Sequence, residues 1–162
     1  RGFTFMKDEP LFMTMKESPK KNDLIAKEII NNWSEESLAD IIYGYGEERY
    51  ARKIAKAIVE KRKKKSINTT FELVEIIRKI VPFKYIKGKI HFATRSFQAL
   101  RIAVNDELNS LKVGLEKSFN ILKKGGRISV ISFHSLEDRI VKNFFKNKKK
   151  EGKAKLINKK VI

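Results

Sequence analysis

The sequence predicts an α/β protein that also carries a separate helical unit. Residues 20–82 contain four successive amphipathic stretches, which favour a compact group of helices. Residues 94–122 carry one apolar stripe at helical spacing. The stretch RISVISF at 127–133 is rich in β-branched and aromatic residues, so it predicts a buried strand, and a helix-like pattern follows it directly. One strand cannot form a sheet alone, and we expect its partner strands before residue 1 or in another chain.

Local signals define the helices of the helical unit. We expect helices over residues 22–32, 34–45, 47–63 and 71–81. Ser34 is a suitable N-cap for the second helix. Thr69 and Glu72 form the Thr-x-x-Glu pattern of a capping box before the fourth helix, and Pro82 stops it.

The remaining segments are less regular. Residues 1–20 are irregular, although GFTF at 2–5 could form a short strand. The apolar stripe of 94–122 predicts one long helix or two helices broken near Asn109 and Ser110, and Gly125 and Gly126 end it. The segment KAKLINKKVI at 153–162 could form a terminal strand.

The net charge of the chain is strongly positive. Lys and Arg total 37 and Asp and Glu total 19, which gives +18 among 162 residues. A charge of this size indicates a polyanionic partner, with nucleic acid as the first candidate and an anionic membrane surface as the second. An excess of solvated lysines is the alternative interpretation.

The composition also excludes or disfavours several kinds of chemistry. The chain has no cysteine, so it has no disulfide, thiolate metal site or cysteine nucleophile. It has two histidines, and we expect no metal site. No apolar run reaches the roughly 20 residues of a membrane span, and no signal peptide is evident, so we expect a cytoplasmic protein. The chain begins with Arg, and we expect it to be a piece of a longer protein.

The stretch ISFHSLEDRIVKNFF at 131–145 is the first candidate site. Phe133, His134 and Ser135 follow the predicted strand, and ligands of open α/β sheets bind beyond the carboxyl ends of the strands. Ser135 and Asp138 fit a Ser-x-x-Asp helix cap, which is the preferred interpretation of Ser135. His134 is more typical of a cleft lining, because polar side chains at such an edge usually line one.

Basic residues form the further candidate sites. Arg95 and Gln98 lie one turn apart in IHFATRSFQALRIAVNDEL at 90–108, where they could contact RNA or could simply be solvated. Lys63 and Lys64 belong to the run KRKKK at 61–65. They could contact phosphates, although solvated lysines are the commoner case.

Four segments form longer motifs: GFTF-x-x-D-x-P-L at 2–11, WSEESLADIIYGYGEERYARKIAKAIV at 33–59, HFATRSFQALRIAVNDEL at 91–108 and GGRISVISFHSLEDRIVKNFF at 125–145. They resemble the family of small-subunit ribosomal RNA cytosine-N4 methyltransferases, called methyltransferase H. They stand in the family's order and cover nearly the whole chain. The pattern departs from that of the family at Phe12, Thr14, Lys16 and Phe92.

The resemblance implies part of a class I, Rossmann-like methyltransferase domain with an inserted all-helical substrate-recognition domain. Residues 20–88 would be the insert, and 1–19 and 89–162 would belong to the methyltransferase domain. The implied reaction is N4-methylation of a cytidine of 16S rRNA in the small ribosomal subunit, with S-adenosylmethionine as the cofactor. Because the family's Gly-rich cofactor loop precedes residue 1, we expect the chain to bind the cofactor poorly and to be inactive alone.

Roles for individual residues follow as hypotheses. We expect Phe133 and His134 to line the cytidine pocket and Asp138 and Arg139 to hold its edge, with Phe133, His134 and Asp138 as the catalytic residues. The residues expected to bind substrate or RNA are His91, Arg95, Gln98, Ser135, Arg139, Lys63 and Lys64.

Three alternatives stay open. The chain could be a non-enzymatic, basic RNA-binding module or a helical DNA-binding protein. It could also form a homodimer. We expect no membrane partner.

Overall fold

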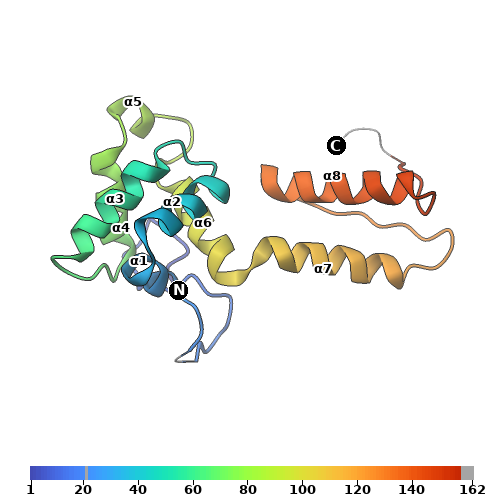
Figure 1. Ribbon diagram of the computed structural model, residues 1–162, viewed down its shortest axis with the longest axis horizontal. Coiled ribbons are helices and arrows are strands. Elements are labelled where there is room, and N and C mark those ends of the chain that lie inside the picture. The colour runs from blue at the N-terminus through green and yellow to red at the C-terminus, as the bar shows by residue number, and fades with distance from the viewer. Residues whose placement is uncertain (21, 158–162) are drawn as a thin grey trace. The chain divides into compact units, whose positions relative to one another are not determined.

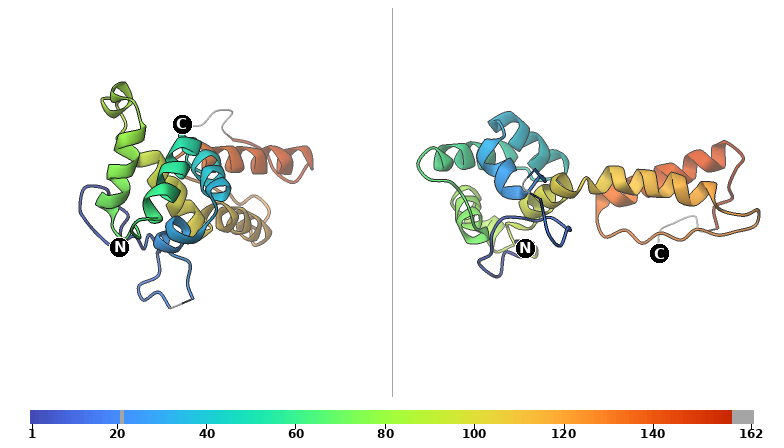
Figure 2. Two further views of the ribbon diagram at one scale, coloured as in Figure 1. Left: turned by 60° about the vertical axis from the view of Figure 1, so that its left-hand side comes forward. Right: turned by 90° about the horizontal axis from the view of Figure 1, so that it is seen from below.

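The computed structural model describes residues 1–20 and 22–157, and it divides them into two units, Arg1–Asn105 and the part from Asp106 onward. The two units are coloured from blue to red along the chain in Figure 1, and Figure 2 gives two further views. The first unit contains α1 Ala26–Asn32, α2 Glu35–Gly44, α3 Ala51–Arg62, α4 Thr70–Ile80, α5 Phe83–Ile86 and α6 Thr94–Asn105. The second contains α7 Glu107–Asn120 and α8 Ser135–Lys150.

The core of the first unit is built from the apolar faces of its helices. α2 packs against α3 and α6, α3 packs against α4, and α1 contacts α3 and α6. The completely buried side chains include Ile29, Leu38, Ile54, Leu73 and Ile77, with Leu100 nearly so. These residues come from the amphipathic stripes in the sequence, and their burial is the main force that holds these short helices together.

The N-terminal segment is fixed to this core without forming a strand. The backbone N–H of Leu11 donates to the carbonyl of Asn68 at 3.1 Å, and the carbonyl of Leu11 accepts from Lys27 at 2.8 Å. Pro10 and Thr69 form a single isolated bridge. The possible strand at residues 2–5 is therefore not formed, and the segment is anchored by single contacts instead of a ladder.

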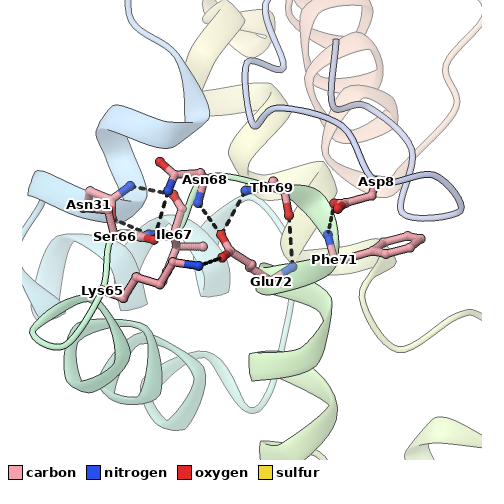
Figure 3. A network of polar contacts seen from close by, with 9 residues as sticks. All are labelled: Asp8, Asn31, Lys65, Ser66, Ile67, Asn68, Thr69, Phe71 and Glu72. Carbon is pink, nitrogen blue, oxygen red and sulfur yellow. Dashed lines mark hydrogen bonds and ion pairs between the residues drawn. The ribbon is translucent and has the colours of Figure 1, made fainter.

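The loop before α4 carries the polar network shown in Figure 3. The Thr69 hydroxyl accepts from the backbone N–H of Glu72, and the Glu72 carboxylate accepts from the backbone N–H of Thr69. Asn31 of α1 exchanges two hydrogen bonds with the backbone of Ile67, at 2.8 and 2.9 Å. The capping box predicted from sequence is confirmed, and the bonds between Asn31 and Ile67 connect α1 to the loop before α4.

The second unit consists of α7 and α8, which pack against each other, and of the segment that joins them. The Phe119 and Phe144 rings meet edge to face at 5.9 Å. Lys148 pairs with Glu116 at 2.8 Å. Leu115 and Leu136 are the buried apolar residues of this unit. The long helical pattern of 94–122 is thus divided between the two units.

The prediction of a strand over residues 127–133 was wrong. Residues 127–133 form no strand, and neither does any other segment of 1–20 or 22–157, where all the regular structure is helical. A strand needs a neighbour to accept and donate its backbone hydrogen bonds, and no described segment supplies one. The α/β class is therefore not formed by these residues. The possible strand at 153–162 lies partly outside the described residues.

The break in the long helix lies at Asp106, not near Asn109 and Ser110 as predicted. Asp106 has a φ of 47° and a ψ of 43°, in the left-handed region. Asp tolerates that region better than most residues, because its short side chain can bond locally. The carboxylate of Asp106 accepts from the Asn109 amide at 2.9 Å. No helix among the described residues is long and apolar enough to cross a membrane.

Candidate functional site

A cavity of about 440 Å³ in the first unit collects basic and aromatic side chains. It lies where α5 and the loop after it meet the starts of α3 and α6. Its lining residues are Arg49, Tyr50, Pro82, Lys84, Tyr85, Gly88, Lys89, Ile90, His91 and Arg95. Four of them carry a positive charge and none carries a negative one. We call this cavity the basic pocket.

A buried carboxylate supports one wall of the basic pocket. Glu48 is completely buried, and its carboxylate accepts from the Tyr85 hydroxyl at 2.6 Å and from the backbone N–H of Tyr50 at 2.9 Å. The Arg95 guanidinium donates to the Tyr85 oxygen and to the Glu47 carbonyl, each at 3.4 Å. Burial, helped by the bond to Glu48, raises the pKa of Tyr85 to about 12, so its hydroxyl keeps its proton.

Arg49 lies on the aromatic part of this pocket. Its guanidinium carbon is 5.0 Å from the Tyr50 ring centre and 5.0 Å from that of Tyr85, which is within cation–π range. The two rings meet edge to face at 5.3 Å. Among the described residues, Arg49, Lys84 and Lys89 form no ion pair with a carboxylate. Their charges are consequently available to a ligand.

His91 and Gln98, both predicted to bind RNA, have different surroundings. His91 lines the basic pocket and stacks on Phe5 at 4.1 Å and on Phe92 at 4.3 Å. Burial lowers the pKa of His91, which favours the neutral ring. Gln98 donates to the carbonyl of Tyr45 at 3.2 Å, so it braces the end of α2. His91 and Arg95 share the pocket, and Gln98 is not among its lining residues.

His134 is the N-cap of α8, a role that the sequence assigned to Ser135. The backbone of His134 is extended, with φ −147° and ψ 165°, and its Nδ1 accepts from the N–H of Glu137 at 3.4 Å. Ser135 is already the first helical residue, which corrects the predicted Ser-x-x-Asp cap. The side chain of His134 is 11% exposed. The cap therefore uses the imidazole, and the hydroxyl of Ser135 lies one position too late for this role.

The second ring nitrogen of His134 faces carboxylates. Nε2 lies 3.4 Å from Oε1 of Glu137, yet it is buried and has no hydrogen-bond partner of good geometry. Glu107, His134 and Glu137 place one ligand atom each within 4.8 Å of one another. The other oxygen of Glu137 accepts from the N–H of Phe133 at 2.8 Å. We call these three residues the His134 cluster.

The His134 cluster is better suited to a hydrogen bond than to a metal ion. Because Nδ1 accepts a hydrogen bond, the proton of the neutral imidazole lies on Nε2. A metal at Nε2 would need that proton on Nδ1, where it would meet the N–H of Glu137. The arrangement instead directs an N–H toward the carboxylates.

The other predicted site residues of the second unit lie on or near α8. Phe133 is 89% exposed, directly before the helix. Asp138 pairs with Lys142 at 2.6 Å. Ser135 and Arg139 are exposed, and each takes part in an interaction with another residue. Phe133, His134 and Ser135 are adjacent as the sequence requires, but only His134 is largely enclosed.

Lys63 and Lys64, predicted to bind RNA, lie at the C-terminal end of α3. Their side chains are exposed, and within residues 1–20 and 22–157 neither forms an ion pair. Their neighbour Lys65 pairs with Glu72 at 2.9 Å. They are not among the lining residues of the basic pocket.

A larger cavity, of about 1100 Å³, lies in the second unit between residues 122–132 and α8. Asp138 lines it, whereas Phe133 and His134 do not. Its charged lining residues are Lys123, Lys124, Arg127, Asp138, Lys142, Lys146, Lys153 and Lys155. The single carboxylate among them is the one already paired with Lys142. The cavity is consequently strongly cationic.

Sequence reasoning missed three of the four cations that line the basic pocket. Arg49, Lys84 and Lys89 were not selected, although the first stands in GEERY and the other two in FKYIKGK. In each segment a cation stands beside a tyrosine, which is the local signal that was present. Nothing in the sequence indicates that Tyr50 and Tyr85 come together.

The chain is similar to known proteins over its whole length. A sequence profile of the MraW methylase family matches residues 1–160. A ribosomal RNA small subunit methyltransferase H of Coprothermobacter proteolyticus is 54% identical over all 162 residues, which are 52% of that protein. The protein of the same name in Persephonella marina is 49% identical, and the chain covers 54% of it. That of Synechocystis is 56% identical over 146 residues, 46% of its length.

The chain thus spans about half the length of the curated relatives that it matches. The family profile, in contrast, covers nearly all of this chain. The resemblance drawn from the four sequence segments is confirmed. The chain belongs to the MraW methylase family.

Proposed function

We propose that this chain is the RNA-binding portion of an S-adenosylmethionine-dependent methyltransferase that modifies N4 of a cytidine in 16S rRNA. The match of residues 1–160 to the MraW methylase family carries this proposal. The relatives' name, ribosomal RNA small subunit methyltransferase H, supports the substrate. The work of such an enzyme would lie in the bacterial cytoplasm, where small subunits are assembled.

The residues described here do not suit the methyl donor. S-adenosylmethionine carries a sulfonium and an ammonium group against one carboxylate, so it is a cation. The large cavity of the second unit is lined by seven cations, and its single carboxylate is paired with Lys142. Repulsion between like charges disfavours the donor there. We therefore assign this chain to the recognition of RNA and not to the binding of the donor.

The chemistry of the acceptor defines what the protein must provide. The cytosine amine is a weak nucleophile, because its lone pair is delocalised into the ring. Orientation supplies most of the gain in such a reaction, and the base must leave its stack to be oriented. The exposed ring of Phe133 offers a stacking face, and the adjacent His134, whose enclosed Nε2 faces Glu137, fixes the start of α8 beside that ring. We propose that these two groups position the base, with Asp138 and Arg139 beside them.

The experiment uses a chimera. The 162-residue chain replaces the matching half of the Coprothermobacter proteolyticus relative, and the RNA product is analysed for N4-methylcytidine by mass spectrometry. We expect methylation of 16S rRNA in small subunits. If the parent relative is active in the same assay and the folded chimera is not, the proposed activity is wrong.

A second candidate is an RNA-binding module that acts without methyl transfer, and the cationic lining of both cavities favours it. The chimera separates the two, because a module that acts without methyl transfer would yield no N4-methylcytidine. Calorimetric titration of the chain with S-adenosylmethionine tests the assignment of the donor site, because micromolar binding would contradict a chain without one. Binding to 16S rRNA is compared with binding to duplex DNA over a salt series. Equal affinities would favour the DNA-binding alternative.

A further inference from the structure

We propose that the basic pocket binds a phosphodiester group of an RNA strand, with Arg49 as the main contact and Lys84 and Lys89 as flanking charges. The identification of the strand as RNA rests on the proposed function. The anionic nature of the ligand rests on the pocket alone.

The charges of the pocket call for an anion. Arg49, Lys84, Lys89 and Arg95 line one cavity, and its lining contains no acidic residue. The carboxylate of Glu48, which bonds the lining residues Tyr50 and Tyr85, is completely buried and already accepts these two hydrogen bonds. Cations held close together repel one another, and a phosphate relieves that repulsion.

Arg49 differs from Arg62 and Arg95 in having guanidinium N–H groups that are not used within the described part of the protein. Arg62 donates to the carbonyls of Ile30 and Trp33, each at 2.7 Å, and is thereby used to join α3 to α1. Arg95 donates to Tyr85 and Glu47. Arg49, in contrast, makes no side-chain hydrogen bond to any described residue. Its planar set of N–H donors matches the two oxygens of a phosphate.

The aromatic rings hold Arg49 in place for this contact. Contact with Tyr50 and Tyr85 at 5.0 Å restricts the guanidinium while leaving its N–H groups without protein acceptors in the described part. Tyr85 is itself fixed through its bond to Glu48. Such restriction lowers the entropy that is lost when the ligand binds.

The size of the pocket favours a nucleotide unit over a bare phosphate ion. Its volume of about 440 Å³ falls within the range of pockets that hold small organic ligands. Ile90, which is 57% exposed, adds an apolar surface beside the tyrosines. A base next to the bound phosphate can pack on that surface, as bases do on aromatic side chains in single-strand sites.

The test measures binding of the 162-residue chain to a single-stranded 16S rRNA oligonucleotide over a salt series. R49Q is compared with R52Q, which removes the same charge from an exposed position on α3 outside the pocket. We expect R49Q to weaken binding about tenfold and to make the slope of log affinity against log salt shallower by roughly 0.7. R52Q should leave the slope unchanged. R49K should restore most of the slope and only part of the affinity, because Lys lacks the fork of donors.

The outcomes separate the possible errors. If R49Q and R52Q behave alike, the pocket is not the phosphate site. If R49Q abolishes the binding of inorganic phosphate in a calorimetric titration but leaves the affinity for RNA and its salt slope unchanged, the pocket is a site for free phosphate and the assignment to RNA is wrong. If the chimera is inactive but R49Q binds RNA more weakly than the wild type, the proposed methyltransferase activity is refuted, while the proposed RNA site in the basic pocket stays supported.

Discussion

The hydroxyl of Tyr85 donates a hydrogen bond of 2.6 Å to the carboxylate of Glu48, which is completely buried beneath the basic pocket. Replacing Tyr85 with Phe leaves that carboxylate with one bond fewer, in a place that water does not reach. We expect Y85F to lower the free energy of unfolding by about 2 kcal/mol. Urea denaturation followed by circular dichroism measures this.

The matched variant is E48Q. Its amide oxygen can still accept from the N–H of Tyr50, and its NH₂ group can donate to Tyr85 after the hydroxyl rotates. E48Q should therefore be less destabilising than Y85F. The double variant should be less destabilised than the sum of the two, and strict additivity would show that the two groups do not interact.

Gly46 allows the loop before α3 to approach α6. A Cβ atom at this position would lie 2.5 Å from the carbonyl oxygen of Arg95 and 2.6 Å from that of Ile42. We expect G46A to destabilise the protein by about 2 kcal/mol or more, because backbone atoms must move. At Gly44, the last residue of α2, a Cβ would meet no atom within 4 Å. G44A should stabilise by roughly 0.5–1 kcal/mol. Equal thermal unfolding midpoints for the two variants would contradict this account.

The capping box of Thr69 and Glu72 supports the start of α4. We expect T69A to reduce stability by about 1 kcal/mol, since the N–H of Glu72 loses its acceptor. Ser66 contributes its backbone carbonyl to the same network, where it accepts from the Asn68 amide. S66A should consequently leave the urea midpoint unchanged. A similar loss in both variants would show that the loop responds to any change.

The lowered pKa of His91 predicts a loss of stability in mild acid. Since the folded state disfavours the charged imidazole, the unfolded chain binds more protons below the ordinary value of 6.5, and stability falls as the pH decreases through that region. H91F keeps a ring between Phe5 and Phe92 without the titrating group. The fall in urea midpoint from about pH 7 to about pH 5 should be smaller in H91F than in the wild type.

The acidic groups provide the internal check on that experiment. Glu9, Asp23 and Glu72 have lowered pKa values, so their contribution is lost only as the pH falls below 4.5, 3.8 and 4.5, respectively. Both proteins should therefore lose stability equally in that lower range. An equal dependence above about pH 5 would mean that His91 is not responsible.

Two variants of His134 separate its cap from its proposed role toward the base. H134A removes the acceptor for the N–H of Glu137 and should reduce stability by about 1 kcal/mol. H134N keeps a good N-cap and should be nearly as stable as the wild type. In the chimera, both should lower turnover by about 10²-fold with unchanged affinity for the donor. If H134N has the same turnover as the wild type, His134 acts only as the cap of α8 and does not position the base.

The helices were predictable where local chemistry determines them. Ser34 and Thr69 cap α2 and α4 as expected, because the capping oxygen and the N–H that it bonds are three residues apart. The cap of α8 was assigned one residue too late, since Ser is a far commoner N-cap than His. The break at Asp106 was missed because the apolar stripe continues at helical spacing on both sides of it, with Val104 before and Leu108 after.

The basic pocket could not be predicted because it depends on contacts between distant parts of the chain. Glu48 stands in the helix predicted for 47–63 and Tyr85 follows the helix that ends before Pro82, and only the packing of α5 near the segment before α3 brings them together. Arg95 was predicted as a site residue from its place in a half-apolar helix, but its hydrogen bonds to Tyr85 and Glu47 were not predicted. The domain limits proposed at residues 20 and 88 stay a prediction. The structure divides at Asp106 instead of at either of these points.

The extended stretch 127–133 has a consequence for the behaviour of the chain in solution. Ile131 is 81% exposed and Phe133 89%, and the backbone between them has no ladder among the described residues. Open N–H and C=O groups beside alternating apolar side chains are a template for aggregation through edge pairing. The high positive charge opposes such self-association, and salt screens that charge. Raising the ionic strength should therefore lower the solubility of the chain.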